Sequence, residues 1–352
     1  MFKSTIFHFK NHFIIVVSLV VVFLVTGCGI TSLRNKIKHA EYLPQHSVET
    51  ISYKKSDFSD LKQLINTILK RPFNPSFLKL KSEQYTAELI TEDEKDFWYL
   101  SPIHTGKGPY IIIARNPERN LVLEAPHPIK DRFTGIQSVL LLKALGGRAA
   151  IISGNNRCAA MSKSHCDGTT SVCSGIRESY PISDPSHYLP NMFHSSHVLF
   201  AKLWPKALFI QLHGFSGRGT KTLFVLSDGS IGQKNNAASV VNRVRDSLRK
   251  SLKSSKLATS CQDLQDNRYK YRRVCGRTNI QGRHLNLSPD ICHKGTFTTT
   301  NRFLHIEQQW LVREQINHYG YDAESDKLQG ALIKSLLEVS PCIKKCSQNH
   351  NK

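Results

Sequence analysis

Two histidines and an aspartate follow apolar stretches of this chain that read as buried strands. His127 and Asp131 come after the stretch 120–125, and His213 comes after the stretch 207–212. The carboxyl ends of strands in an open α/β sheet are where ligands bind, because the loops converge there. Two imidazoles and one carboxylate, with a fourth position left to water, are the usual ligands of a catalytic zinc ion. We therefore predict a Zn²⁺ site made by His127, Asp131 and His213.

A hydrolytic zinc site also needs a general base, and Glu307 in the stretch HIEQ at 305–308 is the best candidate. The apolar residues around it predict a strand over 302–311, which would carry Glu307 to the same edge of the sheet. His305 points the same way along that strand, so it is either a supporting residue or a rival ligand. Zinc lowers the pKa of its water to about 7 and polarises a carbonyl. The expected chemistry is attack of zinc-bound water on an amide, with Glu307 moving the proton.

The order of these residues resembles that of the zinc-dependent carboxypeptidase-like hydrolases. The likeness is nearest to the branch that contains N-formylglutamate amidohydrolases and phage poly-γ-glutamate hydrolases. It spans residues 105–312 and depends on short motifs, namely PH at 126–127, HG at 213–214, TNIQGR at 278–283 and HIEQ at 305–308. The resemblance implies a phosphorylase/hydrolase-like fold, with His127, Asp131 and His213 as metal ligands and Glu307 as the base.

Asp131 departs from the family pattern, in which glutamate is commoner at this position. The shorter side chain requires the loop to come closer to the metal, so Glu124 or Gln137 is an alternative source of a ligand or of support. His194 and His197 would share one face of a helix, but that helix offers no carboxylate for a second metal. The residues whose part in the site stays open are Glu124, Gln137, His187, His194, His197 and His305.

The substrate side of the site calls for arginine, because a planar guanidinium matches a carboxylate and can stabilise an oxyanion. Arg157 follows a predicted strand end, and Arg283 lies in TNIQGR, where the resembling family approaches its substrate. Asn279 beside it could donate its amide to a backbone carbonyl. We predict Arg157, Asn279 and Arg283 as substrate-binding residues for a substrate that bears a carboxylate.

The N-terminus reads as a targeting segment. Lys3 and Lys10 precede an apolar stretch at 13–25 that is short for a membrane span. The stretch ends in VTGC, which resembles a bacterial lipoprotein signal with Cys28 as the lipidated residue. Lipid at Cys28 would hold the mature protein to a membrane surface in the bacterial envelope. The absence of Asp after Cys28 favours the outer membrane, facing the periplasm.

Nine cysteines are present, of which Cys28 is assigned to lipid. Eight remain, and no pair has the CxxC spacing of a zinc knuckle. An even number in an oxidising compartment favours up to four disulfide bonds, with open connectivity. These residues are Cys158, Cys166, Cys173, Cys261, Cys275, Cys292, Cys342 and Cys346.

The charge balance is strongly basic, with 48 Lys and Arg against 27 Asp and Glu, a net charge of +21. Such a surface favours anionic polymers, and anionic cell wall is a possible partner. Nucleic acid is disfavoured as a partner, since no zinc-finger, bZIP or RRM signature accompanies the charge. The stretch GFSGRG at 214–219 has neither the GKS ending of a phosphate loop nor the spacing of a serine nucleophile elbow.

Strand and helix patterns alternate along most of the chain, which predicts an α/β fold with a mostly parallel, mixed central sheet and helices on both faces. The predicted organisation is a lipoprotein signal peptide at 1–27, a tether at 28–50, a short helical preface at 51–104 and a zinc hydrolase-like domain at 105–346. Predicted strands are 110–116, 120–126, 148–154, 206–215, 222–229 and 302–311, and predicted helices are 134–147, 191–204, 236–252 and 325–340.

The expected function is a metal-dependent amide hydrolase of the cell envelope, acting on an N-acyl amino acid, a γ-glutamyl compound or a peptidoglycan peptide. One alternative is a peptidoglycan hydrolase of the N-acetylmuramoyl-L-alanine amidase type, which expects a glutamate ligand where this chain has Gln137. The other is a non-catalytic envelope-binding lipoprotein. Zinc content separates the binding protein from the two enzymes.

Overall fold

The computed structural model describes residues 32–48, 51–70, 79–217, 219–231, 238–261, 263, 272–318 and 327–343. Strands in these ranges are β1 (Lys79–Lys81), β2 (Tyr85–Glu92), β3 (Lys95–Pro102), β4 (Tyr110–Ala114), β5 (Leu121–Ala125), β6 (Ala149–Ile152), β7 (Thr169–Thr170), β8 (Glu178–Ser179), β9 (Leu208–Phe215), β10 (Phe224–Ser227), β11 (Ala258–Ser260) and β12 (Phe303–Gln309).

Helices in the same ranges are α2 (Leu33–Lys38), α3 (Lys55–Lys70), α4 (Thr134–Leu145), α5 (Met192–Leu203), α6 (Val240–Ser251), the short 3₁₀ helix η1 (Arg272–Val274), α7 (Ile280–Leu285), α8 (Trp310–His318) and α9 (Lys327–Leu337). No helix in the described part of the chain is both long and apolar enough to cross a bilayer. The predicted signal segment at 1–27 and the predicted lipidation residue Cys28 lie outside the described residues.

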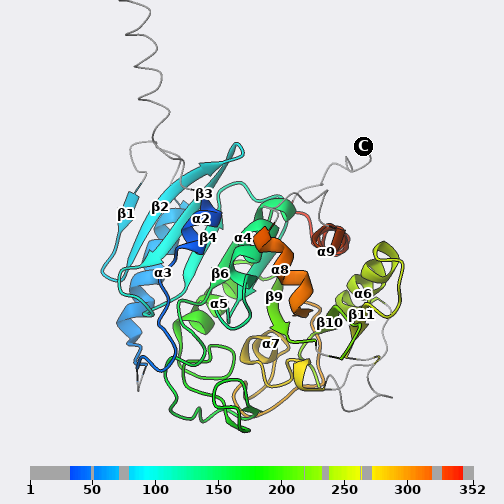
Figure 1. Cartoon of the computed structure of the whole chain (residues 1–352). Helices are drawn as coiled ribbons and strands as arrows, with labels where there is room; N and C mark the ends of the chain where they lie inside the picture. Colours follow the sequence, from blue (N-terminus) through cyan, green and yellow to red (C-terminus); the bar gives the residue numbers. More distant parts are fainter. Residues whose placement is uncertain are drawn as a thin grey trace, which may run out of the picture.

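One ten-stranded mixed sheet runs through the described residues, in the order β1-β2-β3-β4-β6-β5-β9-β12-β10-β11 (Figure 1). Its four central strands, β6, β5, β9 and β12, are parallel to one another. Antiparallel pairs flank them, since β4 pairs with β6 and β10 pairs with β12 in that sense. The predicted α/β class with a mixed central sheet is confirmed.

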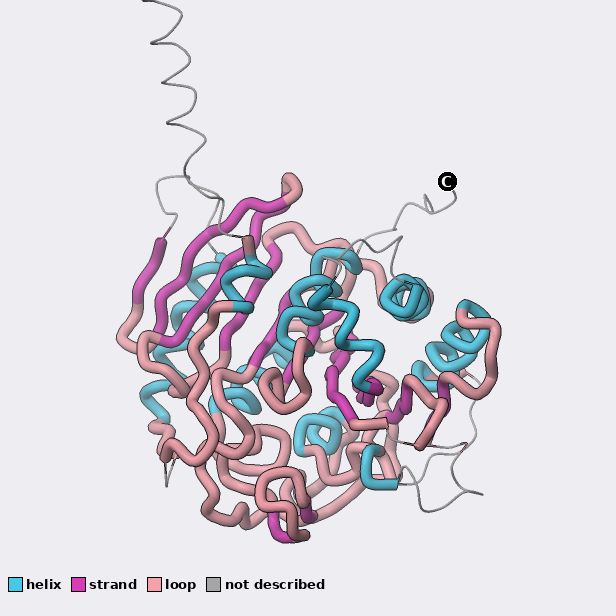
Figure 2. Tube along the Cα trace, in the orientation of Figure 1, coloured by secondary structure: helices cyan, strands magenta, loops and turns pink. Residues whose placement is uncertain are grey.

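The central strands are apolar on both faces because helices cover both sides of the sheet. One core lies between the sheet and the helices α2, α4, α6, α8 and α9. A second core lies on the opposite face, under α3, α5 and α7. Long loops gather at the end of the sheet where the parallel strands finish (Figure 2). This edge therefore joins residues from distant parts of the sequence.

The N-terminal part differs from the prediction. Residues 33–38 of the predicted tether form α2, with Ser32 as its N-cap, and Leu33 and Ile37 are buried against the core around α4. Two apolar residues four positions apart are too weak a periodic signal to reveal so short a helix. The predicted preface contains α3 as expected, but its strands β1, β2 and β3 extend the central sheet and do not form a separate unit.

Disulfide bonds join Cys158 to Cys173, Cys166 to Cys292, and Cys261 to Cys275. Cys342 is also disulfide-bonded. Disulfide formation is therefore confirmed for the described cysteines, and Cys346 lies outside the described residues. The bonds at Cys158, Cys166 and Cys261 fasten loops that follow the strands β6 and β11, where little regular structure holds the chain.

Candidate metal centre

The turn after β5 carries two of the predicted ligands. The Asp131 N–H donates to the carbonyl of His127 at 2.8 Å, and the Thr134 N–H donates to the carbonyl of Asp131 at 3.2 Å. Phe133 has a φ of 72°, a left-handed conformation that redirects the chain into α4. The compact turn folds Asp131 back over His127, which is the close approach that a short aspartate side chain requires.

His213 and Glu307 lie on neighbouring parallel strands. His213 is inside β9 (Leu208–Phe215), which falls within the predicted strand 206–215, so the histidine does not follow the strand but belongs to its last three residues. The register of β12 against β9 pairs Glu307 with His213. Residues paired across parallel strands project to the same face, so Glu307 comes to the side of the sheet from which His213 projects.

Three acceptor atoms meet at this edge, as the sequence predicted. His127 Nδ1 lies 3.2 Å from His213 Nδ1. Asp131 Oδ2 lies 3.4 Å from His127 Nδ1 and 3.3 Å from His213 Nδ1. All three side chains are buried. The structure therefore brings the three predicted ligands together into a nearly equilateral triangle.

The outer nitrogens of both imidazoles are committed as donors. His127 Nε2 lies 2.9 Å from Asp184 Oδ1, and an ionised carboxylate only accepts. His213 Nε2 lies 2.7 Å from Gln211 Oε1, and the Gln211 amide nitrogen donates to Glu124 Oε2 at 3.0 Å. Because both Nε2 atoms carry the hydrogen, both Nδ1 atoms present lone pairs to each other and to Asp131. Such a group of acceptors needs a positive charge among them.

The pKa shifts of the three side chains describe the charge state of this cluster. Burial lowers the pKa of His213 and keeps that imidazole neutral. Burial raises the pKa of Asp131, but its contacts with the two imidazoles outweigh burial and hold the pKa below its ordinary value. Burial and Arg157 lower the pKa of His127, yet Asp184 and Asp131 raise it by more. A neutral imidazole and an ionised carboxylate are the forms in which these side chains bind a metal ion.

The spacing of the three atoms fits a zinc-sized ion. Tetrahedral ligands at about 2.0 to 2.2 Å from an ion lie about 3.3 to 3.6 Å from one another. The observed separations of 3.2, 3.3 and 3.4 Å lie at or within 0.1 Å of the lower end of that range. The second partners on both imidazoles are of the kind that orients metal-binding histidines. The residues present therefore fit a divalent metal of the predicted type.

Glu307 is a buried carboxylate that lies opposite His213 in the register of β12 against β9. Its Oε1 lies 3.3 Å from His305 Nε2, and its Oε2 is buried without a hydrogen-bond partner among the described residues. The His305 ring stacks on His213 with centroids 4.4 Å apart, and its Nδ1 is likewise buried and unpartnered. Unpaired buried polar atoms are uncommon in folded proteins and indicate a site for a ligand or a reaction.

Asp184 is a supporting residue that the predicted site did not include. It is fully buried and accepts from His127, from His187 Nδ1 at 3.0 Å and from the Ser186 N–H at 3.0 Å. Its other oxygen pairs with Arg157 at 2.5 Å. Burial raises the pKa of Asp184, but Arg157, His127 and His187 outweigh burial and lower it. The signal available in sequence was only an aspartate in a loop, 57 residues away from the histidine that it orients.

A chain of hydrogen bonds behind His213 was also missed. It continues from Gln211 to Glu124, whose Oε1 lies 2.7 Å from His197 Nδ1. His197 Nε2 then lies 3.1 Å from Nδ1 of the half-buried His284. Burial raises the pKa of Glu124 to about 8, and burial lowers the pKa of His197 to about 3. The proton of this pair therefore resides on Glu124, and every link of the chain can donate in the same direction.

The predicted substrate residues have different surroundings. Arg157 is buried and held by Asp184, and its Nη1 makes no hydrogen bond to the described residues. Asn279 caps α7 through the Gly282 N–H and donates its amide to Gln211 Oε1, so it supports the partner of His213. Arg283 holds both oxygens of Asp167 and three backbone carbonyls. Of the three, Arg157 retains a nitrogen for a substrate, and Arg283 is committed to loop structure.

The residues left open by the sequence can be placed as well. Gln137 in α4 forms a reciprocal amide pair with Gln308 and also donates to Gln329, so its side-chain amide is engaged by two other glutamines. It therefore does not offer the helix ligand that the muramoyl amidase alternative expects. His194 packs its ring near His197 and His284, and its Nδ1 is buried without a partner. The three histidines do not bring one donor atom each within 4.8 Å of one another, in contrast to the ligand triangle.

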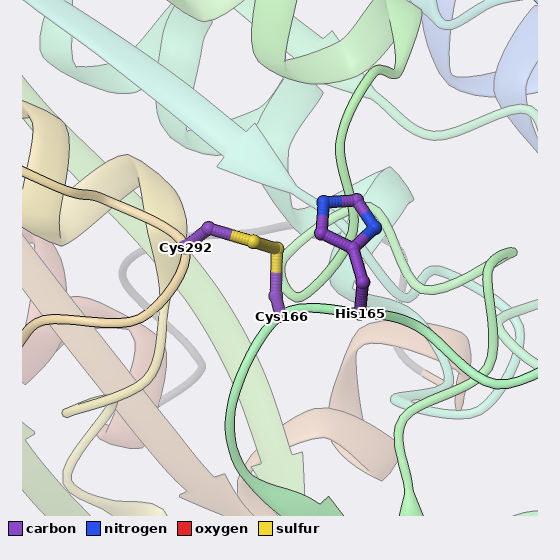
Figure 3. Close-up of side chains that lie close together, drawn as sticks. All are labelled: His165, Cys166 and Cys292. Atoms are coloured by element: carbon purple, nitrogen blue, oxygen red, sulfur yellow. A yellow bond between two sulfur atoms is a disulfide. The ribbon is translucent and has the colours of Figure 1, made fainter.

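A second group of possible ligands, His165, Cys166 and Cys292, does not make a metal site. Figure 3 shows the two sulfur atoms joined in a disulfide beside the His165 ring. Thiolates bind metals, and oxidised cysteines have no thiolate to give. The cluster at 127, 131 and 213 is thus the candidate metal centre in the described part of the chain.

No protein-family model matches the chain, and no curated protein matches it either. Among solved structures, the chain is similar to an N-formylglutamate amidohydrolase from Ralstonia eutropha JMP134. The TM-score is 0.38 and the identity 13%, over 66% of this chain and 97% of the other. A similarity at this level carries no argument about the reaction, so the proposal below is argued from the geometry of the site.

Proposed function

We propose that this chain is a metal-dependent amide hydrolase of the cell envelope, acting on a substrate that bears a carboxylate. N-acyl amino acids, γ-glutamyl compounds and peptidoglycan peptides are the candidate substrates. One observation carries the proposal, namely the meeting of three acceptor atoms from His127, Asp131 and His213, with Glu307 and its unpaired Oε2 opposite His213 in the strand register. A buried group of acceptors suits a cation, and a buried unpaired carboxylate oxygen suits a proton acceptor.

His127, Asp131 and His213 would hold the metal ion, for which zinc is the best candidate. When bound, a divalent ion lowers the pKa of water to about 7 and polarises an amide carbonyl. Asp184 and Gln211 keep the two imidazoles in the tautomer that presents Nδ1. Outer partners of this kind are worth a 10- to 100-fold change in metal affinity.

Glu307 would move the proton. Its Oε1 is held toward His305, which leaves Oε2 to accept a proton from the attacking water and to return it to the leaving amide nitrogen. One water is consumed, and a carboxylic acid and an amine are formed. Arg157, anchored by Asp184, would turn its Nη1 toward negative charge on the carbonyl oxygen.

The envelope location is a proposal from the sequence alone. It depends on the lipoprotein-like signal that ends at Cys28 and on the net charge of +21, which would favour an anionic polymer at the site of action. Labelling of the expressed protein with a fatty-acid probe tests the anchor. Loss of the label in Cys28→Ala supports it, and a label that persists in that variant contradicts it.

Hydrolysis is tested with the zinc-loaded chain on N-formyl and N-acetyl amino acids, poly-γ-glutamate and muropeptides, with products identified by mass. Glu307→Gln should keep the metal and lose about 10²- to 10⁴-fold in turnover, because the amide cannot accept the proton. Glu83→Gln, on the exposed surface, is the matched control and should retain full activity. A fully active Glu307→Gln would discard the assignment of the base. A metal-loaded chain that cleaves none of these amides would contradict the function.

A further inference from the structure

Arg313 at the start of α8 is a buried arginine without a carboxylate partner. The buried arginines of the described residues are Arg157, Arg283 and Arg313, with 8%, 2% and 4% of their surface exposed. Arg157 pairs with Asp184 and Arg283 pairs with Asp167. No carboxylate oxygen of the described residues lies within 4 Å of Arg313. A buried cation is costly unless an anion or several hydrogen bonds compensate it, and the hydrogen bonds of Arg313 go to two backbone carbonyls.

The contacts of Arg313 place its guanidinium between the strand ends that build the candidate metal centre. Its Nη1 donates to the carbonyl of Arg132 at 2.9 Å, and its Nε donates to the carbonyl of Gln308 at 3.3 Å. The guanidinium also occupies the position that a Cβ on Gly214 would take, which explains glycine there. Residues 132, 308 and 214 directly follow Asp131, Glu307 and His213 in the chain. Arg313 therefore touches the backbone beside three of the site residues.

One edge of this guanidinium is left over. Nη2 makes no hydrogen bond to the described residues, and it is not among their sealed, unpartnered polar atoms. The nitrogen is thus open to a small ligand. Trp310, with its ring centroid 5.5 Å from the Arg313 Cζ, helps to fix the plane of the group. Burial lowers the pKa of Arg313 below its ordinary value, and the charges of Asp131 and Glu307 oppose that fall.

We propose that Arg313 is the anion-binding residue of this site and that its Nη2 holds the carboxylate of an N-acyl amino acid or γ-glutamyl substrate. The inference rests on the proposed function for the identity of the ligand. A purely structural role, in which Arg313 only links the strand ends, would use the hydrogen bonds of Nε and Nη1 and would leave Nη2 without a partner. The anion-binding role uses all three nitrogens, and it replaces Arg283, whose nitrogens are committed to Asp167 and backbone carbonyls.

Binding of a carboxylate to the metal-free chain tests the proposal without any need for catalysis. N-acetyl-L-alanine is titrated by NMR against the full chain in the presence of a chelator, and the neutral N-acetyl-L-alaninamide serves as the uncharged probe. Arg313→Gln should weaken binding of the carboxylate about tenfold, because one charge-assisted hydrogen bond is lost. Arg313→Lys should keep part of it, since lysine retains the charge but not the fork. The amide should bind weakly and equally to every variant.

Arg302→Gln is the matched control. Arg302 lies at the opposite end of β12 and, like Arg313, donates to backbone carbonyls, here those of Ala207, Ala201 and Trp204. Its loss should leave carboxylate binding unchanged. Circular dichroism follows folding, and Arg313→Lys carries the test if Arg313→Gln does not fold. If Arg313→Gln folds and binds the carboxylate with wild-type affinity, the proposal is overturned. If only Arg313→Lys folds, the proposal is overturned when that variant binds with wild-type affinity and the chain shows no preference for the acid over the amide. An equal loss in Arg302→Gln would overturn it too.

Amide hydrolysis by the metal-loaded variants separates the two levels of inference. Carboxylate binding that depends on Arg313, in a chain that cleaves no amide, leaves the anion site standing and overturns the proposed function. Cleavage by the wild type with an unchanged KM for carboxylate substrates in Arg313→Gln overturns the anion site alone. A raised KM for carboxylate substrates, with kcat nearly kept and neutral substrates unaffected, supports both.

Discussion

Glu124 provides a quantitative test of the buried chain behind His213. Its side chain is fully buried between Gln211, which donates to Oε2, and His197, whose Nδ1 lies 2.7 Å from Oε1. Burial raises its pKa from 4.5 to about 8, although the Gln211 hydrogen bond and His284 oppose the rise. At neutral pH the carboxyl group is therefore protonated. Glutamine is the neutral isostere of that form, so Glu124→Gln should preserve every hydrogen bond of the chain.

The size of the effect follows from the two pKa values. Between pH 4.5 and about 8 the folded protein keeps a proton on Glu124 that the unfolded chain releases, so stability must fall as the pH rises. The slope is about 1.4 kcal/mol per pH unit, and the whole interval amounts to about 5 kcal/mol. Below the unfolded pKa of 4.5, Glu124 causes no loss of stability. Above the folded pKa of about 8, the free energy of unfolding has fallen by the full amount.

Urea unfolding of the wild type and Glu124→Gln at pH 5, 6, 7 and 8 measures this slope. The stability of the variant relative to the wild type should rise by about 4 kcal/mol from pH 5 to pH 8. Other titrating groups are common to both proteins and cancel in the difference. Glu83→Gln on the exposed surface should run parallel to the wild type throughout. A constant difference between Glu124→Gln and the wild type would refute a protonated Glu124 and the chain built on it.

Two further predictions concern Asp184, which orients His127, and the disulfide bonds. Asp184→Asn should weaken metal binding by about 10- to 100-fold, because the partner that orients His127 loses its charge; competition with a chelator measures it, and unchanged affinity would count against the role of Asp184. Removing the Cys166 to Cys292 bond, which spans 126 residues, should cost about 5 kcal/mol of unfolding free energy, against about 3 kcal/mol for the Cys158 to Cys173 bond with a span of 15. Urea unfolding of the paired alanine variants checks this order, which a larger loss at the shorter span would contradict.

The central fold could be predicted from the sequence because its strands are continuous apolar runs and its helices have clear stops. The run YIIIA became β4, and the run before His213 became β9. The N-terminal strands were not recognised as part of the sheet. Their residues alternate between buried and exposed positions in β2, and their pairing with β4 is set by long-range contacts that no local pattern records.

The ligand triangle could be predicted from the sequence, because residues at the ends of neighbouring parallel strands lie close together in space. The residues that support the ligands could not be predicted in this way. Asp184 comes from an irregular loop and meets His127 only in the folded chain. Gln211 was hidden inside an apolar strand, although a polar residue two positions before His213 on the same face was a signal that could have been used. Arg283 had the expected residue type, but its nitrogens were taken by a loop carboxylate that sequence alone cannot assign.

Metal content of the purified chain tests the central claim most directly. Elemental analysis by mass spectrometry should find one divalent ion, with zinc expected, for each wild-type chain and for His165→Asn, whose imidazole lies beside the Cys166 to Cys292 disulfide. His213→Asn should lose the ion, because one corner of the ligand triangle is gone. A wild-type chain that neither contains nor takes up a divalent ion, or a His213→Asn chain that keeps it, would contradict the account.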